Sequence, residues 1–160
     1  MIGNVRDAVG YACARFPGAV GLMGSSQGGV LTLLAAGGEH RIRAAFPHNV
    51  LFTPLRESLS VTRFPNALGV AYPVIRRIIA AAGRVLPGLQ VPMSFYLDVD
   101  KIFSEQEWRD EFYRDPLGLT SYPVSFLSSL FATDMPALVD GSITCPVVAF
   151  VSMGDPLFTR

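Results

Sequence analysis

The chain has 160 residues, of which 50% are hydrophobic and 16% are charged, and its formal net charge is zero. This composition is typical of a globular protein and argues against intrinsic disorder. No run of lysine or arginine is long enough to neutralise a series of phosphates, so we expect no nucleic-acid partner.

Targeting and metal signals are absent from the sequence. The first residues carry no basic segment followed by an apolar one, so no secretory signal is expected and a cytoplasmic location is the default. The most apolar stretch, 69–86, is interrupted by three arginines, which argues against a transmembrane segment. Cys13 and Cys145 lack metal-type or redox-type spacing and are expected to be reduced thiols. We predict no metal site and no cofactor.

The first part of the chain predicts a helix, a strand and a second helix. Residues 4–16 carry apolar side chains at helical spacing and are followed by Pro17 and Gly18. Residues 19–24 form a short apolar run bounded by glycines, which favours a strand buried on both faces of a parallel sheet. Residues 30–36 are apolar nearly all round, which favours a buried helix.

Two later segments predict further parallel core strands, at 43–47 and at 146–152. The residues between them contain frequent prolines and no convincing strand pattern, which indicates several helices separated by turns. We therefore predict an α/β fold with a core at 1–50, an inserted helical cap at 51–140 and a final core segment at 141–160.

The motif Gly24-Ser25-Ser26-Gln27-Gly28 matches G-x-S-x-G, in which a serine lies on a tight turn between a strand and a helix. The serine backbone is strained in such a turn, and we expect a Cβ atom at either flanking glycine, Gly24 or Gly28, to collide with its surroundings. An ordinary Gly-Ser helix cap is the alternative. The apolar strand before the motif and the apolar helix after it favour the nucleophile turn.

With this motif the chain resembles the α/β hydrolases, in particular the branch similar to lysophospholipases, monoacylglycerol lipases and serine aminopeptidases. The resemblance rests on segments 7–9, 16–17, 24–29, 145–151 and 154–158. It implies a partial α/β-hydrolase fold with Ser26 as nucleophile, Asp155 as triad acid and the backbone N–H of Gln27 as an oxyanion donor. Ser25 stands where many relatives carry a histidine.

A carboxylate at Asp155 has a chemical reason, because a buried aspartate orients the catalytic histidine and stabilises its protonated form. Gly154-Asp155-Pro156 is also a favourable turn sequence, so a structural role is the alternative.

The catalytic histidine is the missing part, because the family order of serine, aspartate and histidine places it after Asp155. His40 is expected in a turn beyond the second helix, as a solvated residue. His48 is expected at the carboxyl end of the next strand, where it could line the pocket together with Ser25. We therefore expect the chain to be an excerpt, truncated at both ends and inactive alone.

The predicted cap is rich in apolar residues. These could roof an acyl pocket, and the basic amphipathic segment 72–82 could meet a lipid surface, although core packing and a solvated face are the stronger explanations of the two patterns. The apolar residues in question are Leu68, Phe95, Phe103, Trp108, Phe126, Leu130 and Phe131.

The leading hypothesis is a serine hydrolase that cleaves carboxylic esters or related acyl bonds through an acyl-serine intermediate, with a hydrophobic acyl ester as substrate. The alternative is a non-catalytic α/β-hydrolase-like binding module or degenerate paralogue. Truncated sheet edges would also favour self-association.

Overall fold

A computed structural model of the chain describes residues 1–53, 55, 58–59, 62–64, 66–103, 105–132, 134 and 136–155. The chain divides into two compact units. The core unit combines residues 1–52 with 134–160, and the helical unit spans 53–133. The helical unit thus falls within the range predicted for the cap.

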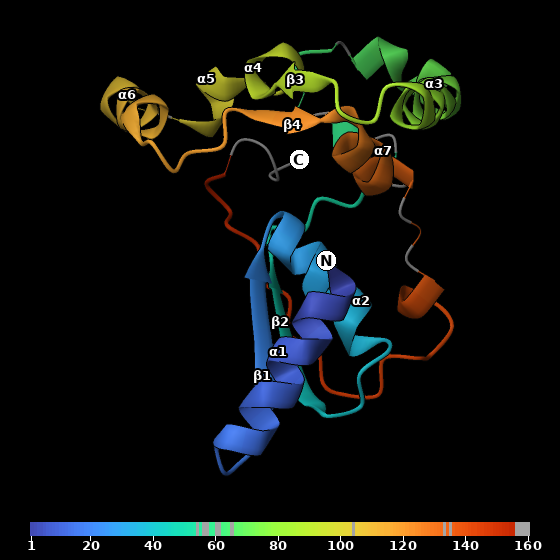
Figure 1. Cartoon of the computed structure of the whole chain (residues 1–160), viewed down its shortest axis with the longest axis vertical. Coiled ribbons are helices and arrows are strands. Elements are labelled where there is room, and N and C mark those ends of the chain that lie inside the picture. The colour runs from blue at the N-terminus through green and yellow to red at the C-terminus, as the bar shows by residue number, and fades with distance from the viewer. Residues whose placement is uncertain are drawn as a thin grey trace. The chain divides into compact units, whose positions relative to one another are not determined.

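The core unit has the predicted order of helix, strand, helix and strand, which Figure 1 shows in blue to cyan. Its elements are α1 (Ile2–Arg15), β1 (Val20–Ser25), α2 (Gln27–Ala36), β2 (Ile42–His48) and the short 3-10 helix η3 (Pro136–Leu138). Strands β1 and β2 pair in parallel, with Gly24 opposite Pro47 and Ser25 opposite His48. A small parallel sheet flanked by helices is therefore the architecture of this unit.

The segment predicted as the last core strand, 146–152, lies beside β2 but forms only two parallel bridges, Ala45 to Val147 and His48 to Phe150. The Ala45 N–H donates to the Pro146 carbonyl at 3.0 Å, and the Phe150 N–H donates to the Pro47 carbonyl at 2.9 Å. Between these bonds a regular ladder requires an N–H at position 47. Proline has none, so the predicted continuous strand is reduced to two bridges.

The packing of the core unit follows from the apolar periodicity. Val9 of α1, Ala35 of α2 and Ile42 of β2 are buried together, and four half-buried residues pack against them: Val5, Val20, Leu22 and Cys145. Helix α2 is buried along most of its length, as the sequence predicts. Cys13 and Cys145 are both free thiols.

The helical unit contains most of the helices. Its elements are η2 (Asn66–Ala71), α3 (Tyr72–Val85), β3 (Gln90–Pro92), α4 (Met93–Tyr96), α5 (Val99–Ile102), α6 (Gln106–Arg114), β4 (Ser121–Pro123) and α7 (Val124–Ala132). The antiparallel pair β3 and β4 corrects our prediction of helices alone. Each strand has three residues and ends in proline, so neither is long enough to give an alternating pattern.

Helices α3 and α7 pack closely at Gly83, where a Cβ atom would lie 2.4 Å from Ser128 Cβ. At the start of α3 the buried hydroxyl of Tyr72 donates to the Thr53 carbonyl and bonds the Ser58 hydroxyl at 2.9 Å. Burial raises the pKa of Tyr72. Among the described residues, no helix has the length and apolar character needed to cross a bilayer.

Candidate functional site

Ser26 occupies the sharp turn between β1 and α2, with φ 54° and ψ −114°. A positive φ is uncommon for a residue with a side chain, and such a conformation costs about 1–3 kcal/mol. The backbone N–H of Ser26 donates to the His48 carbonyl at 2.9 Å, which fixes the turn to the end of β2. The predicted strand–turn–helix arrangement is confirmed, with β1 ending one residue later than expected, at Ser25.

The turn depends on Gly24 rather than on both flanking glycines. A Cβ atom at Gly24 would lie 2.2 Å from the Gly28 carbonyl oxygen and 2.7 Å from Thr32 Oγ1. A Cβ atom at Gly28 would meet nothing within 4 Å, so the collision we predicted there is wrong. Gly28 is the second residue of α2, and its Cβ direction faces open space. Gly24 instead packs against the carbonyl group of Gly28. The oxygen of this carbonyl accepts a hydrogen bond from Thr32 Oγ1 at 2.9 Å.

Gly29 is a second close contact that the sequence reasoning did not identify. A Cβ atom there would lie 2.9 Å from Val50 Cγ2 and 3.2 Å from the His48 carbonyl oxygen. The signal was the Gly28-Gly29 pair itself, because two adjacent glycines at the start of a helix carry a cost in helix propensity. Gly29 thus brings α2 against the end of β2.

The amino terminus of α2 meets the site at Gln27, its first residue. An N–H at this position has no intrahelical acceptor and is open to an external one. The Ser26 carbonyl, by contrast, is engaged by the N–H groups of Gly29 at 3.0 Å and Val30 at 3.3 Å. This placement is compatible with the predicted role of Gln27 as an oxyanion donor, helped by the positive end of the helix dipole.

His48 lies at the end of β2 between two serine hydroxyls. Its Nδ1 atom is 2.9 Å from Ser25 Oγ, and its Nε2 atom is 2.9 Å from Ser152 Oγ. The structure therefore brings together the two residues that we predicted as pocket lining, Ser25 and His48. Both ring nitrogens are engaged by hydroxyls other than that of Ser26. His40 is exposed in the turn that precedes β2, as expected for a solvated residue.

Asn49 ties the Asp155 loop to the end of β2. Its Nδ2 atom donates to Asp155 Oδ2 at 2.9 Å, and its Oδ1 atom accepts the Ser152 N–H at 2.9 Å. Asn49 is 6% exposed and adopts φ 42°, a left-handed conformation that asparagine tolerates better than most residues. Sequence reasoning missed this residue. An asparagine directly after a predicted strand was the available signal.

Asp155 follows the 146–152 segment, so it stands at the same sheet edge as Ser26, where parallel strands have their carboxyl ends. Its backbone N–H donates to the Ser152 carbonyl at 3.1 Å, which is a turn contact. The turn role and the carboxylate role are therefore compatible. Pro156 lies outside the described residues.

Together these residues place a strained serine, a helix amino terminus and a carboxylate at one edge of the small sheet. Within the described ranges, no three histidine, cysteine, aspartate or glutamate side chains are grouped so that they could hold a metal ion. No family model, curated protein or solved structure matches this chain.

Proposed function

We propose that this chain carries the nucleophile and the acid of a serine hydrolase with a partial α/β-hydrolase fold. The observation that carries the proposal is the backbone of Ser26, which holds a positive φ at a strand–helix junction. Such strain persists only where the surroundings enforce it, and it is concentrated at functional sites. The helical unit is inserted in sequence between the two parts of the core unit, as a cap would be.

The proposed reaction is cleavage of a carboxylic ester or related acyl bond. Ser26 Oγ attacks the carbonyl carbon and loses its proton to a base, while the carbonyl electron pair moves to oxygen and is stabilised by the Gln27 N–H. The base then protonates the leaving alcohol, and an acyl-Ser26 ester remains. In the second half of the reaction the base takes a proton from water, and the water oxygen attacks the acyl carbon. The bond to Ser26 Oγ then breaks, the base returns its proton to Ser26, and the carboxylic acid leaves. Asp155 stabilises the protonated base in both halves.

Among the residues that the structure describes, none is in place to act as the base. The two histidines of the chain are His40, in a distant turn, and His48, whose ring nitrogens bond Ser25 and Ser152. A serine hydroxyl without a base is a weak nucleophile at neutral pH. We therefore expect the chain alone to hydrolyse esters very slowly.

Exogenous imidazole tests the proposal, because it can supply the missing base. Hydrolysis of p-nitrophenyl acetate is measured at increasing imidazole for the native chain, Ser26→Ala and the adjacent control Ser25→Ala. A general base contributes about 10²–10⁴ to such reactions, so partial rescue should raise the Ser26-dependent rate at least about tenfold. Ser25→Ala should respond like the native chain, and Ser26→Ala should show only the background reaction of imidazole.

The second candidate is a non-catalytic binding module with the same fold. The engagement of both His48 nitrogens by hydroxyls other than that of Ser26 favours it. This alternative predicts identical rates for the native chain and Ser26→Ala at every imidazole concentration.

A further inference from the structure

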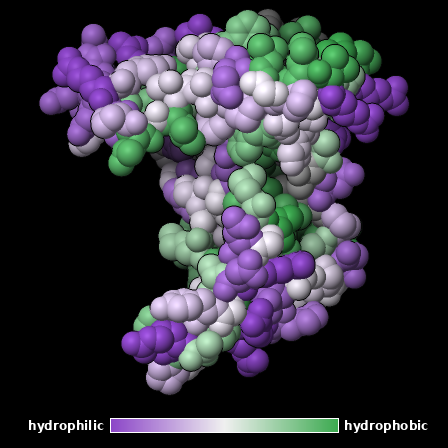
Figure 2. Space-filling model, viewed as in Figure 1, coloured by the Kyte–Doolittle hydropathy of each residue, from purple (hydrophilic) through white to green (hydrophobic). Residues whose placement is uncertain are grey.

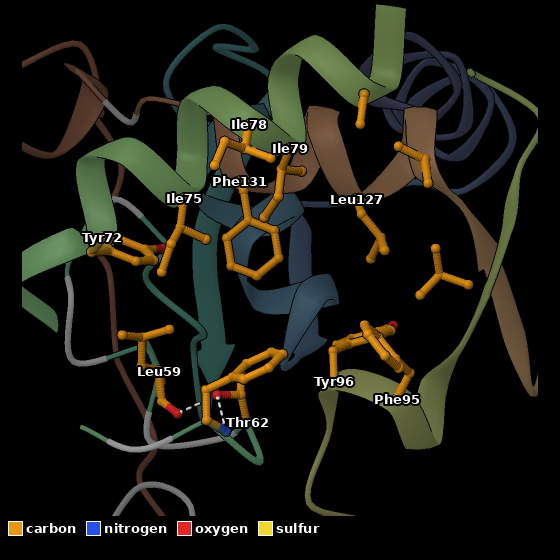
Figure 3. A pocket seen from close by; sticks show the side chains of 14 residues that line it. Leu59, Thr62, Tyr72, Ile75, Ile78, Ile79, Phe95, Tyr96, Leu127 and Phe131 are labelled. Atoms are coloured by element: carbon orange, nitrogen blue, oxygen red, sulfur yellow. Dashed lines mark hydrogen bonds between the residues drawn. The ribbon is translucent and has the colours of Figure 1, made fainter. Parts of the chain in front are cut away.

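The helical unit contains a cavity of about 260 Å³. Figure 3 shows side chains from α3, α4 and α7 and from the segment around Leu59 and Thr62 converging on it. Ile75 and Ile79 come from α3, and Leu127 and Phe131 come from α7. All of its lining residues belong to one compact unit, so its shape follows from the packing within that unit.

The surface of this cavity is entirely apolar. The hydroxyls of its lining residues Thr62 and Tyr72 are engaged elsewhere. Thr62 Oγ1 donates to the Leu59 carbonyl at 2.7 Å and accepts the Phe64 N–H at 3.2 Å. The Tyr72 hydroxyl bonds Ser58 and Thr53. Tyr96 carries the third hydroxyl among the lining residues, and the surface that the cavity presents to a ligand is apolar.

An apolar wall selects against water and against polar ligands. A buried polar group without a partner costs several kcal/mol, whereas a cavity lined by leucine, isoleucine and phenylalanine stays dry and binds hydrocarbons. The rim is open to solvent, since Ile78 is 62% exposed and Phe95 is 68% exposed. Figure 2 shows apolar side chains gathered on the surface over this part of the unit. A bound molecule can thus bury an apolar part and keep a polar end in water.

The volume sets the length of that apolar part. An apolar cavity of about 150 Å³ accommodates the six carbons of benzene, so a cavity of about 260 Å³ accommodates about ten carbons. This is below the 300–1,000 Å³ or so of sites for larger ligands.

We propose that this cavity binds one saturated hydrocarbon chain of about ten carbons, with its polar end left outside. Binding requires neither Ser26 nor Asp155, so this inference stands apart from the proposed hydrolase activity. The cavity volume limits the expected ligand to a hydrocarbon chain of medium length, rather than apolar molecules of any size. Of the aromatic residues that the sequence suggested for an acyl pocket, Phe95 and Phe131 line the cavity.

The experiment measures the affinity of the full chain for hexanoate, octanoate, decanoate and tetradecanoate by titration calorimetry, below their micelle concentrations. Each added methylene that enters an apolar site should tighten binding about fourfold. We expect this gain to stop near ten carbons. 1-Decanol should bind within a few fold of decanoate, because the wall recognises the chain and leaves the polar end in solvent.

Matched variants on α3 locate the site. Ile79 lines the cavity, and Ile79→Trp should fill it and weaken decanoate binding at least about tenfold. Val74 is 55% exposed outside the cavity, and Val74→Trp should leave binding unchanged. Ala82 also lines the cavity, and Ala82→Leu adds a smaller side chain there than Ile79→Trp while keeping a strong helix former. This variant replaces Ile79→Trp in the experiment if that protein fails to fold.

Three results would overturn the inference: no binding of decanoate, affinity that keeps rising from ten to fourteen carbons, or equal binding by the filled and control variants. The last two indicate adsorption to exposed apolar surface. Ser26→Ala should bind decanoate like the native chain. A failure of binding with retained Ser26-dependent hydrolysis removes only this inference, and the reverse result removes only the hydrolase proposal.

Discussion

Both the core unit and the helical unit contain glycines at close contacts, and the contacts at Gly24 and Gly83 differ in what a Cβ atom would meet. At Gly24 a Cβ atom would lie 2.2 Å from a backbone carbonyl oxygen only four residues away. At Gly83 it would lie 2.4 Å from the side chain of Ser128, on another helix. Backbone held by a short covalent loop cannot retreat, whereas two packed helices can shift. The turn at Ser26 is therefore fixed locally, and the cavity depends on packing between distant segments.

The largest expected effect is that of Gly24→Ala. Because the new Cβ atom would overlap the Gly28 carbonyl, we expect the free energy of unfolding of the core unit to fall by at least about 3 kcal/mol. Gly28→Ala is the matched control, because it faces open space in the first turn of α2, and it should be neutral or stabilise by up to about 1 kcal/mol. Urea unfolding followed by NMR signals of α2 measures both. Equal stability of the two variants would refute the described turn.

A smaller loss is expected for Asn49→Asp, which breaks the hydrogen bond between Asn49 and Asp155. The change replaces the amide that donates to Asp155 with a carboxylate, so two negative charges would face each other across 2.9 Å. We expect a loss of about 2–3 kcal/mol in unfolding free energy at pH 7. Asn4→Asp on the exposed face of α1 should change stability by less than about 0.5 kcal/mol.

Gly83→Ala tests the helix pair. The substitution gains about 1 kcal/mol of helix propensity but forces α3 and α7 apart, and overpacking costs about 1–3 kcal/mol. We expect a net loss of about 1 kcal/mol, below that of Gly24→Ala, together with altered affinity for decanoate. Gly88→Ala meets nothing within 4 Å and serves as control. A loss as large as that of Gly24→Ala would show that the helix pair is as rigid as the turn.

The smallest effect is confined to alkaline pH and concerns Tyr96 in the cavity wall. Burial, and then the neighbouring Tyr122, raises the pKa of Tyr96 to about 12. The folded state thus favours the protonated phenol, and this contribution is complete below about pH 10 and lost as the pH rises towards 12. Tyr96→Phe should therefore lose less stability than the native chain between pH 10 and 12, by on the order of 1 kcal/mol. Parallel stability curves for the two proteins would contradict the burial of this phenol.

The elements whose type the sequence predicted well are those with a clear apolar pattern, namely α1, β1, α2 and β2. The predicted burial of β1 on both faces is wrong, because its residues alternate between half-buried and exposed. The prediction failed where one residue decided the outcome. Pro47 interrupts the ladder beside the 146–152 segment, and the Cβ direction at Gly28 depends on the exact start of α2. The interrupted ladder and the direction of the Gly28 Cβ atom both depend on the exact register of neighbouring residues, which a sequence pattern does not give.

The contacts of the candidate site were only partly predictable. The motif at residues 24–29 predicted the turn at Ser26, because the strained serine and its neighbouring glycines lie in one short segment. The bonds of Asn49 to Asp155 and of His48 to Ser152 join residues more than a hundred positions apart, and no local pattern reports such pairs. The cavity likewise depends on α3 meeting α7, which the amphipathic pattern of each helix permits but does not specify.

The central claim is that the fold makes Ser26 a nucleophile, and covalent labelling tests it most directly. The native chain and the same chain in urea are incubated with a fluorophosphonate, and the modified residue is located by peptide mass spectrometry. We predict slow labelling of native chain at Ser26 in preference to Ser25, acceleration by imidazole, and no selective labelling once the chain is unfolded. Labelling of both serines alike, or at the same rate in urea, would contradict the account.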